Sequence, residues 1–252
     1  MKSGAILEAT AHRAWPVPTA PWVMAQVWHE LLFAHWPIPA EALRSTLPPG
    51  LTLDTYDGQA WLGIVPFRMS HVHPRGVPSL PWISAFPELN VRTYVVAQDR
   101  PGVYFFSLDA ANPVAVAVAR RFFYLPYLNA SMRCVRTGDT VAYTSRRTHR
   151  RATPAEFIGT YRPTGPVFLS RPGSLEHWLT ERYCLYTAHR GTLYRGDIHH
   201  APWPLQPAEA ELTHNTMARS HGIELPQTAP LLHYSHLQEV VVWPLHSVSP
   251  AM

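Results

Sequence analysis

The sequence predicts an α+β fold that is mainly β, with one antiparallel, barrel-like sheet and a few short helices. Turn signals such as Asp57-Gly58 and Thr137-Gly138-Asp139 separate runs that are rich in β-branched and aromatic residues. Helix signals are confined to short stretches that prolines bound. Neither a repeat nor a linker divides the 252 residues, so we expect a single domain over residues 1–252.

The first third of the chain begins with a proline-rich, aperiodic segment and continues into a long apolar-aromatic run. The aromatic and β-branched content of that run favours a buried strand over a helix. Asp57-Gly58 is typical of a two-residue hairpin turn, because both of its positions require positive φ. The predicted elements are an arm over residues 1–22, a strand over 23–36, a short helix over 40–47, a hairpin over 51–69 and a long loop over 70–85.

The remaining chain alternates hairpins with short helices. Asn112 can cap a helix that Pro113 opens, and Ser174 can cap another that carries Glu176 in its first turn. The predicted elements are hairpins over residues 90–108 and 127–147, helices over 113–123 and 173–181, a strand over 157–162, a strand pair over 183–198, a weak helix over 208–212 and a final strand over 238–243.

The composition excludes several classes of protein. Hydrophobic residues make up 46% of the chain and charged residues 15%, which is typical of an ordered globular protein. No apolar run is long enough to cross a bilayer, and Glu8 interrupts what would be the core of a signal peptide. We therefore expect a cytoplasmic protein with no membrane partner, and we interpret Cys134 and Cys184 as reduced core thiols.

The net charge of +4 rests on arginine, because Lys2 is the sole lysine. The one dense basic cluster spans residues 146–151 and contains Arg146, Arg147, Arg150 and Arg151. We interpret it as a solvated strand end and turn, and a phosphate-contacting patch is the alternative. We accordingly expect no nucleic-acid partner.

Polar side chains alternate along the strand predicted to begin near residue 88. A period of two places Glu88, Asn90, Arg92 and Tyr94 on one face and apolar residues on the other. If that polar face lines a cavity, Arg92 offers a planar fork for a carboxylate and Glu88 a buried acid or base with a shifted pKa. The alternative is an internal Glu88–Arg92 ion pair that only satisfies two buried charges.

Neighbouring elements can add polar groups to the same cavity. Ser107 shares a strand face with Asp109, and Tyr127 shares one with Asn129. For Asp109 we favour an outward polar face that leads into the helix start at Asn112. Arg182 follows a helix and can close the cavity, although strand packing also explains it.

Metal and nucleotide sites have little support in the sequence. The histidine pairs, such as His71 with His73, match no spacing that specifies zinc or iron. Neither a glycine-rich nucleotide loop nor a serine-hydrolase elbow occurs. We therefore expect no metal and no cofactor.

A set of segments spread over nearly the full length resembles the YqjF-like family, a domain of unknown function. The matching segments are Trp28-His29-Glu30-Leu31-Leu32-Phe33-Ala34-His35-Trp36, Leu47-Pro48-Pro49-Gly50-Leu51, Asp54-Thr55-Tyr56-Asp57-Gly58 with Ala60-Trp61, Val65-Pro66-Phe67, Glu88-Leu89-Asn90-Val91-Arg92-Thr93-Tyr94-Val95, Gly102-Val103-Tyr104-Phe105-Phe106-Ser107-Leu108-Asp109, Leu125-Pro126-Tyr127, Thr180-Glu181-Arg182-Tyr183, Pro202-Trp203-Pro204-Leu205 and His233-Tyr234-Ser235.

That family in turn is similar to acetoacetate-decarboxylase-like proteins, whose fold is a cone-shaped β structure around an internal pocket. The second resemblance rests on the segment Phe122-Phe123-Tyr124-Leu125-Pro126-Tyr127-Leu128. True acetoacetate decarboxylases carry a lysine pair where this chain has Tyr127 and Leu128, so the resemblance implies the fold and the pocket but not Schiff-base chemistry. It also implies a homo-oligomer.

Two hypotheses follow. The first is a lyase- or isomerase-type enzyme that acts on a small organic acid without a Schiff-base lysine, with Glu88 and Arg92 as catalytic residues. Its substrate-binding residues would be Asn90, Tyr94, Ser107, Tyr127, Asn129 and Arg182. The second is a non-catalytic domain that binds or senses a small molecule in the same cavity.

Overall fold

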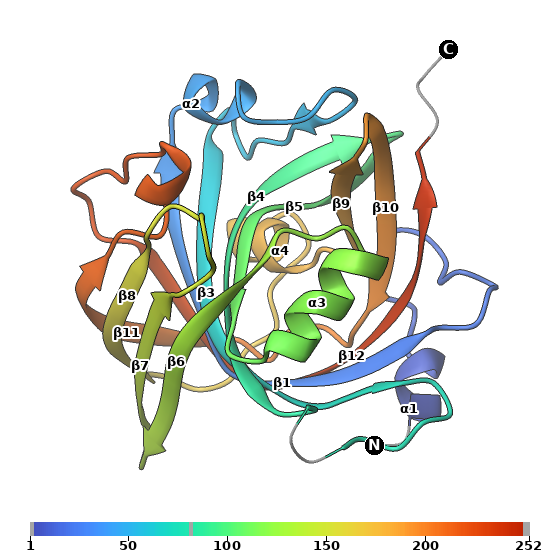
Figure 1. The fold of residues 1–252 in the computed structure, drawn as a ribbon, viewed down its shortest axis with the longest axis horizontal. Helices are drawn as coiled ribbons and strands as arrows, with labels where there is room; N and C mark the ends of the chain where they lie inside the picture. Colours follow the sequence, from blue (N-terminus) through green and yellow to red (C-terminus); the bar gives the residue numbers. More distant parts are fainter. Residues whose placement is uncertain (1–2, 81–82, 249–252) are drawn as a thin grey trace.

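The computed structural model describes residues 3–80 and 83–248 and is mainly β (Figure 1). Its strands are β1 (Met24–Ile38), β2 (Thr52–Leu53), β3 (Ala60–Pro74), β4 (Phe86–Ala97), β5 (Arg100–Ala110), β6 (Tyr127–Thr137), β7 (Thr140–Arg147), β8 (Glu156–Pro163), β9 (Cys184–His189), β10 (Thr192–His199), β11 (Gln206–Asn215) and β12 (Leu231–Ser247). Its helices are α1 (Ser3–Glu8), α2 (Ala40–Arg44), α3 (Pro113–Phe122), α4 (Leu175–Thr180) and the 3-10 turn η1 (Arg219–His221).

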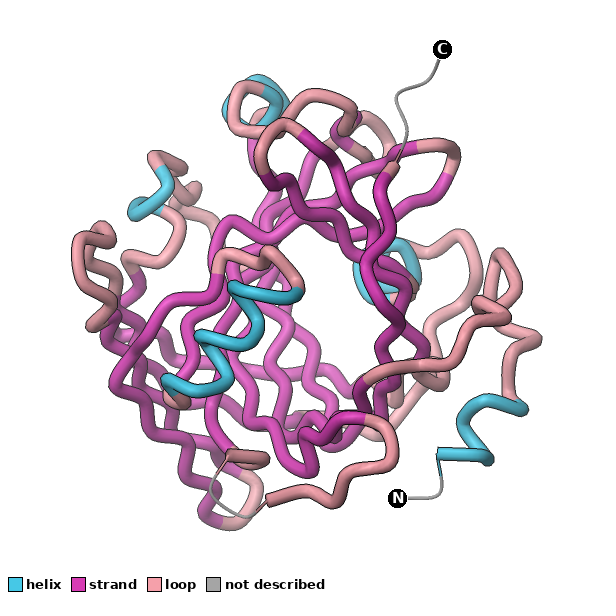
Figure 2. Tube along the Cα trace, turned by 45° about the vertical axis from the view of Figure 1, so that its right-hand side comes forward, coloured by secondary structure: helices cyan, strands magenta, loops and turns pink. Residues whose placement is uncertain are grey.

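All of these strands belong to one 12-stranded sheet that closes on itself. Successive pairings run from β1 through β3, β4, β5, β9, β10 and β12 and return to β1. Most neighbours are antiparallel, and β5 makes parallel pairs with β6 and β9. Figure 2 shows these strands wrapping around the middle of the molecule. The predicted barrel-like sheet is confirmed, with two parallel pairs that the sequence did not indicate.

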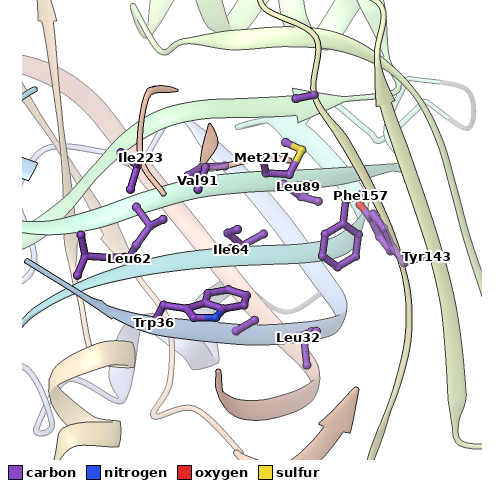
Figure 3. Close-up of a cluster of buried hydrophobic side chains, with 14 of the residues drawn as sticks. Leu32, Trp36, Leu62, Ile64, Leu89, Val91, Tyr143, Phe157, Met217 and Ile223 are labelled. Atoms are coloured by element: carbon purple, nitrogen blue, oxygen red, sulfur yellow. The ribbon is translucent and has the colours of Figure 1, made fainter. Parts of the chain in front are cut away.

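Four of the other strands, β6, β7, β8 and β11, pair in that order and pack against the outside of the ring (Figure 1), and β2 pairs with β4. An apolar core fills the space between them and the outer face of β1, β3 and β4 (Figure 3). In β1, Leu32 and Ala34 belong to this outer core, whereas Leu31 and Phe33 point into the ring. Burial on both faces explains why β1 is a continuous apolar run rather than an alternating one.

Two helices lie on opposite sides of the ring, α3 in front and α4 behind in the view of Figure 1. The Asn112 side chain accepts hydrogen bonds from the backbone N–H groups of Val114 and Ala115, and Pro113 occupies the first turn. Ser174 accepts one from the N–H of His177 at the start of α4. Both predicted caps are confirmed, and they position the two helices over the ends of the ring.

Some local predictions are wrong. Residues 208–212 form part of β11, whose half-buried Ala208, Ala210 and Leu212 pack on the outer core while Glu209 and Glu211 face solvent. Pairing with β8 therefore overrides the helix propensity of this alternating Ala-Glu run. The hairpin predicted over residues 51–69 is only partly correct. Asp57 and Gly58 adopt positive φ as predicted. The strand before this turn, β2, pairs with β4 rather than with β3, the strand that follows the turn.

The arm and the long loop also differ from expectation. Ser3–Glu8 is helical, and the rest of the arm reaches the ring through Arg13, which donates to the carbonyl of Ile198. The predicted loop over 70–85 starts only after β3 ends at Pro74. Pro81, Trp82 and Lys2 lie outside the described residues. In the described part of the chain, no helix is both long enough and apolar enough to cross a bilayer.

Candidate functional site

The ring encloses a cavity of about 100 Å³. This is on the scale of the ~150 Å³ cavity that admits benzene in an engineered protein core. Its wall is mostly apolar and includes Phe33 of β1, Phe67 of β3, and Phe105 and Leu108 of β5. Ala119 of α3 lies at one end and Thr180 of α4 at the other. An enclosed, largely apolar cavity with a few polar groups is the usual form of a small-molecule site.

The polar groups of the cavity come mainly from β4. Glu88, Asn90 and Arg92 line it, whereas Leu89 and Val91 belong to the outer core. The predicted alternation along this strand therefore separates the two faces correctly. Tyr127 joins the site because the parallel pairing of β6 with β5 places it opposite Leu108. Arg182 joins it from the segment after α4.

Glu88 is a buried carboxyl, 1% exposed, at the cavity wall. Burial raises its pKa to about 8, and the negative charge of Asp109 acts in the same direction. A hydrogen bond with the Tyr127 phenol partly opposes this increase in pKa. Glu88 is therefore largely protonated at neutral pH, and its Oε2 has no hydrogen-bond partner among the described residues. A carboxyl in this state can both donate and accept a proton near pH 7.

Arg92 is a half-buried guanidinium that no carboxylate neutralises in the described part of the chain. Its Cζ lies 5.4 Å from the ring centre of Phe33 and 5.8 Å from that of Tyr94. Its Nη2 donates to the carbonyl of Leu179 at 3.4 Å, and its Nε is buried without a partner. Glu88 and Arg92 thus form no ion pair, and the arginine charge remains free to attract an anion.

Arg182 is a second guanidinium at the cavity, but its charge is compensated. Its Nη1 donates to Oδ2 of Asp54 at 2.6 Å, and its Nε donates to the carbonyl of Trp178 at 2.6 Å. Burial lowers its pKa, and Asp54 opposes that decrease. The Nη2 atom is buried and has no partner within residues 3–80 and 83–248. Arg182 is therefore held rigidly and keeps one donor atom for the cavity.

Tyr94 supports the site from behind instead of lining it. It is fully buried, and its hydroxyl lies 2.6 Å from Nε2 of His35. Its ring stacks against both guanidinium groups, with the Cζ of Arg182 5.0 Å from its centre. Gly63 allows this packing, because a Cβ there would lie 3.2 Å from His35 and 3.3 Å from Cγ of Arg92. Tyr94 and His35 thus fix the position of the two arginines.

Ser107 and Asn129, which the sequence assigned to the cavity, do not line it. Ser107 pairs with Val91 across β4 and β5, so it occupies the face of the outer core. There its Oγ accepts a hydrogen bond from Nη2 of Arg147 at 3.0 Å and contacts Nε2 of His221 at 3.0 Å. Asn129 lies under α3, next to His149. Since the side-chain period in a strand is two, the pairing register placed Ser107 on the opposite face from the predicted one.

The same register corrects two further predictions. Asp109 pairs with Leu89, is fully buried, and forms an ion pair with Arg147 at 2.9 Å. It therefore does not belong to an outward polar face. Arg147 is buried as well and also bonds the carbonyl of Thr153, so the basic cluster over 146–151 is not solvated throughout.

Other cavity residues were not predicted as site residues. His200 and Trp203 line the wall after β10, and burial lowers the pKa of His200, which keeps it neutral. Pro202 and Pro204 on either side of Trp203 indicate a rigid loop, but the neighbouring sequence does not indicate that this loop lies at the cavity. No group of three or more metal-ligating side chains gathers within residues 3–80 and 83–248.

Comparisons with known proteins agree with this architecture. The chain is 49% identical over 233 residues to the uncharacterized protein YqjF of Bacillus subtilis (strain 168), covering 92% of this chain and 96% of that protein. It is similar in structure to the acetoacetate decarboxylase of Legionella pneumophila, with a TM-score of 0.62, 13% identity and coverage of 96% and 94% of the two chains. It is also similar to the enduracididine biosynthesis enzyme MppR complexed with pyruvate, with a TM-score of 0.61, 12% identity and 94% coverage of each chain.

At these low identities the two solved structures show the fold alone, and the predicted acetoacetate-decarboxylase-like fold is confirmed. The model of the family DUF2071, described as an uncharacterized conserved protein, matches residues 25–239. This match covers the strands of the ring except Met24 of β1 and residues 240–247 of β12. Together with the 49% identity to YqjF, it shows that the chain is a member of the DUF2071 family of uncharacterized conserved proteins, as the resemblance to YqjF-like proteins predicted.

Proposed function

We propose that this protein is an enzyme of lyase or isomerase type that acts on a small carboxylic acid inside the ring, without a Schiff base. The observation that carries the proposal is the pair formed by a protonated buried carboxyl, Glu88, and an uncompensated guanidinium, Arg92, in one enclosed cavity. The two are close in the chain and face the same space, yet they do not neutralise each other. A carboxyl whose pKa is raised by burial, as that of Glu88 is, is typical of functional sites.

The residues have distinct roles in this proposal. Arg92 binds the substrate carboxylate, and Asn90 and Arg182 orient the bound acid. Glu88 moves the proton, because its pKa of about 8 is close to neutral pH. Tyr127 holds the Glu88 carboxyl by a hydrogen bond. Tyr94 is a positioning residue, and Ser107 and Asn129 have no part in the site.

A Schiff base is excluded from the proposal on the residues themselves. Such a mechanism needs an amine whose pKa is lowered by its surroundings. Lys2 is the sole lysine, and the cavity presents the phenol of Tyr127 at the place where the decarboxylase resemblance puts a lysine. MppR has been solved with pyruvate bound, which supports the view that this fold accommodates small organic acids.

A thermal-shift screen of small carboxylic acids tests the binding half of the proposal. We expect some acids to raise the melting temperature of the wild type and to leave Arg92→Ala unchanged. Arg162→Ala is the matched control, because Arg162 pairs with Glu209 on the exposed surface and lies outside the cavity. If Arg92→Ala responds like Arg162→Ala, the carboxylate site is not at Arg92.

Turnover separates the enzyme from the alternative, a binding or sensing domain. Acids that stabilise the wild type are incubated with it and followed by NMR for proton exchange, isomerisation or loss of carbon dioxide. We expect Glu88→Gln to bind the same acids and to lose about 10²-fold or more in rate. Binding without any turnover by the wild type would favour the sensing domain. The predicted homo-oligomer is checked in the same samples by light scattering.

A further inference from the structure

A set of buried polar atoms around the cavity has no hydrogen-bond partner within the described chain. They are Oε2 of Glu88, Oδ1 of Asn90, Nε of Arg92, Nη2 of Arg182 and Nε1 of Trp203. Buried polar groups in folded proteins are nearly always paired, because each unpaired one costs free energy. Their concentration at one cavity indicates that the molecule which binds there supplies the missing partners.

The donors of this set lie along one wall. Arg92 and Arg182 both stack on the ring of Tyr94. Arg92 also stacks on Phe33, whose ring packs edge-on against Trp203 with 4.9 Å between the centres. The atoms on this wall, Nε of Arg92, Nη2 of Arg182 and Nε1 of Trp203, can only donate. They require a ligand group that accepts several hydrogen bonds, and a carboxylate meets this requirement.

Asn90 requires a different ligand group. Oδ1 of Asn90 is an acceptor, in a side chain that is 6% exposed, and no carboxylate can satisfy it. Asn90 precedes Arg92 by two residues on the same strand face, which corresponds to about 7 Å along the strand. A three- to five-carbon acid bound at Arg92 therefore reaches Asn90 with an oxygen on its second or third carbon. That oxygen must carry a hydrogen.

We infer that the ligand of this cavity is a hydroxy acid with a short apolar chain: its carboxylate accepts from Arg92, Arg182 and Trp203, and its hydroxyl donates to Asn90. The inference rests on the proposed function for the carboxylate site at Arg92. Glu88, the group that moves the proton, lines the same cavity two residues before Asn90 and has its Oε2 without a partner among the described residues. The apolar end of the acid packs on the remaining wall, which includes Phe67, Phe105 and Leu108.

The hydroxyl is what distinguishes this ligand from a keto acid or a plain acid. A carbonyl or a methylene at the same carbon has no hydrogen for Asn90, which would remain buried and unpaired. Sites built to hydrogen-bond a ligand group reject analogues that lack it. From the cost of one unpaired buried acceptor we expect a preference of about tenfold to a hundredfold for the hydroxy acid.

Isothermal titration calorimetry on two matched series tests the inference. One series is 2-hydroxy-3-methylbutanoate, 2-oxo-3-methylbutanoate and 3-methylbutanoate, and the other is 3-hydroxybutanoate, acetoacetate and butanoate. Each is titrated into the wild type, Asn90→Leu and Arg92→Ala. We expect at least one hydroxy acid to bind tenfold or more tightly than its two partners, a ratio near one in Asn90→Leu, and loss of all binding in Arg92→Ala.

The outcomes separate this inference from the function it rests on. If all three acids of each series bind the wild type equally and fail to bind Arg92→Ala, the carboxylate site stands and the hydroxy-acid inference is wrong. A preference that persists in Asn90→Leu likewise contradicts the assignment of the hydroxyl to Asn90. If no acid binds, or if Arg92→Ala binds as the wild type does, both the proposed site and the inference fail.

Discussion

The two faces of strand β4 are both buried, and they are built on opposite principles. On the outer face, Leu89 and Val91 pack with Leu32 and Ile64 in an apolar core (Figure 3). On the inner face, Glu88, Asn90 and Arg92 line the cavity, and each retains a buried polar atom that no described residue partners. Burial alone does not distinguish these faces. What distinguishes them is whether the buried groups are satisfied.

The outer face is not free of charge, which sharpens the comparison. Asp109 of β5, opposite Leu89, and Arg147 of β7 border it and are joined by an ion pair whose side chains are 0% and 2% exposed. Arg147 donates to both oxygens of Asp109, to Ser107 and to the carbonyl of Thr153. Ionisable groups are thus present on both faces, and among the described residues Glu88 and Arg92 of the inner face keep a polar atom without a partner, whereas Asp109 and Arg147 neutralise each other. We therefore expect substitutions on the outer face to affect stability and those on the inner face to affect binding.

The largest effect is expected for Arg147→Met. The substitution leaves the Asp109 carboxyl buried and without its partner, which destabilises the protein by about 3–5 kcal/mol. Urea denaturation measures the loss. The double variant Arg147→Met with Asp109→Leu is the control, and it should recover most of the free energy of unfolding. A single-variant loss below about 1 kcal/mol would show that the pair is not part of the outer core.

Leu89→Ala tests the apolar part of the same face. Leu89 is fully buried, so we expect a loss of about 3 kcal/mol from the lost transfer free energy and the cavity that remains. Leu169→Ala is the matched control, because Leu169 is 61% exposed and its truncation should change stability by less than about 0.5 kcal/mol. Ligand binding by Leu89→Ala should survive wherever the protein is folded. Equal losses in the two variants would contradict the outer core as described.

We expect the free energy of unfolding to depend on pH because of Glu88 on the inner face. The folded protein keeps the Glu88 proton up to about pH 8, whereas the unfolded chain releases it near an ordinary pKa of 4.5. The stabilisation of the folded state by this retained proton is complete below pH 4.5 and is lost as pH rises through 8. The free energy of unfolding changes by at most about 1.4 kcal/mol per pH unit. Glu88→Gln removes this titration. Its unfolding free energy between pH 5 and pH 8 should therefore fall less steeply than that of the wild type, and parallel profiles would refute a raised pKa.

The period of β4 was readable from the sequence because Glu88, Asn90 and Arg92 alternate with Leu89 and Val91. The partners across the sheet were not readable, since the register depends on contacts between distant segments. This is why Ser107 was assigned to the cavity and lies with Arg147 instead. For the same reason His200 and Trp203 could not be assigned to the cavity, because they follow the β4 residues that line it by more than 100 residues. The helix predicted over residues 208–212 was wrong for a different reason, because pairing with β8 outweighed the local helix propensity.

The smallest effect on stability is expected for Asn90→Leu, which also tests the contrast between the two faces of β4 most directly. Leucine has nearly the shape of asparagine but no atom that needs a partner, so the ligand-free protein should gain up to about 1 kcal/mol. In a chain of this size that corresponds to a rise of roughly 2–4 °C in the melting temperature. The same change should abolish the preference for a hydroxyl in the ligand. A protein that becomes more stable and less selective through one substitution has an inner face that serves binding rather than folding. If Asn90→Leu instead destabilises the protein as Leu89→Ala does, Asn90 has a structural partner, and the contrast between the two faces of β4 fails.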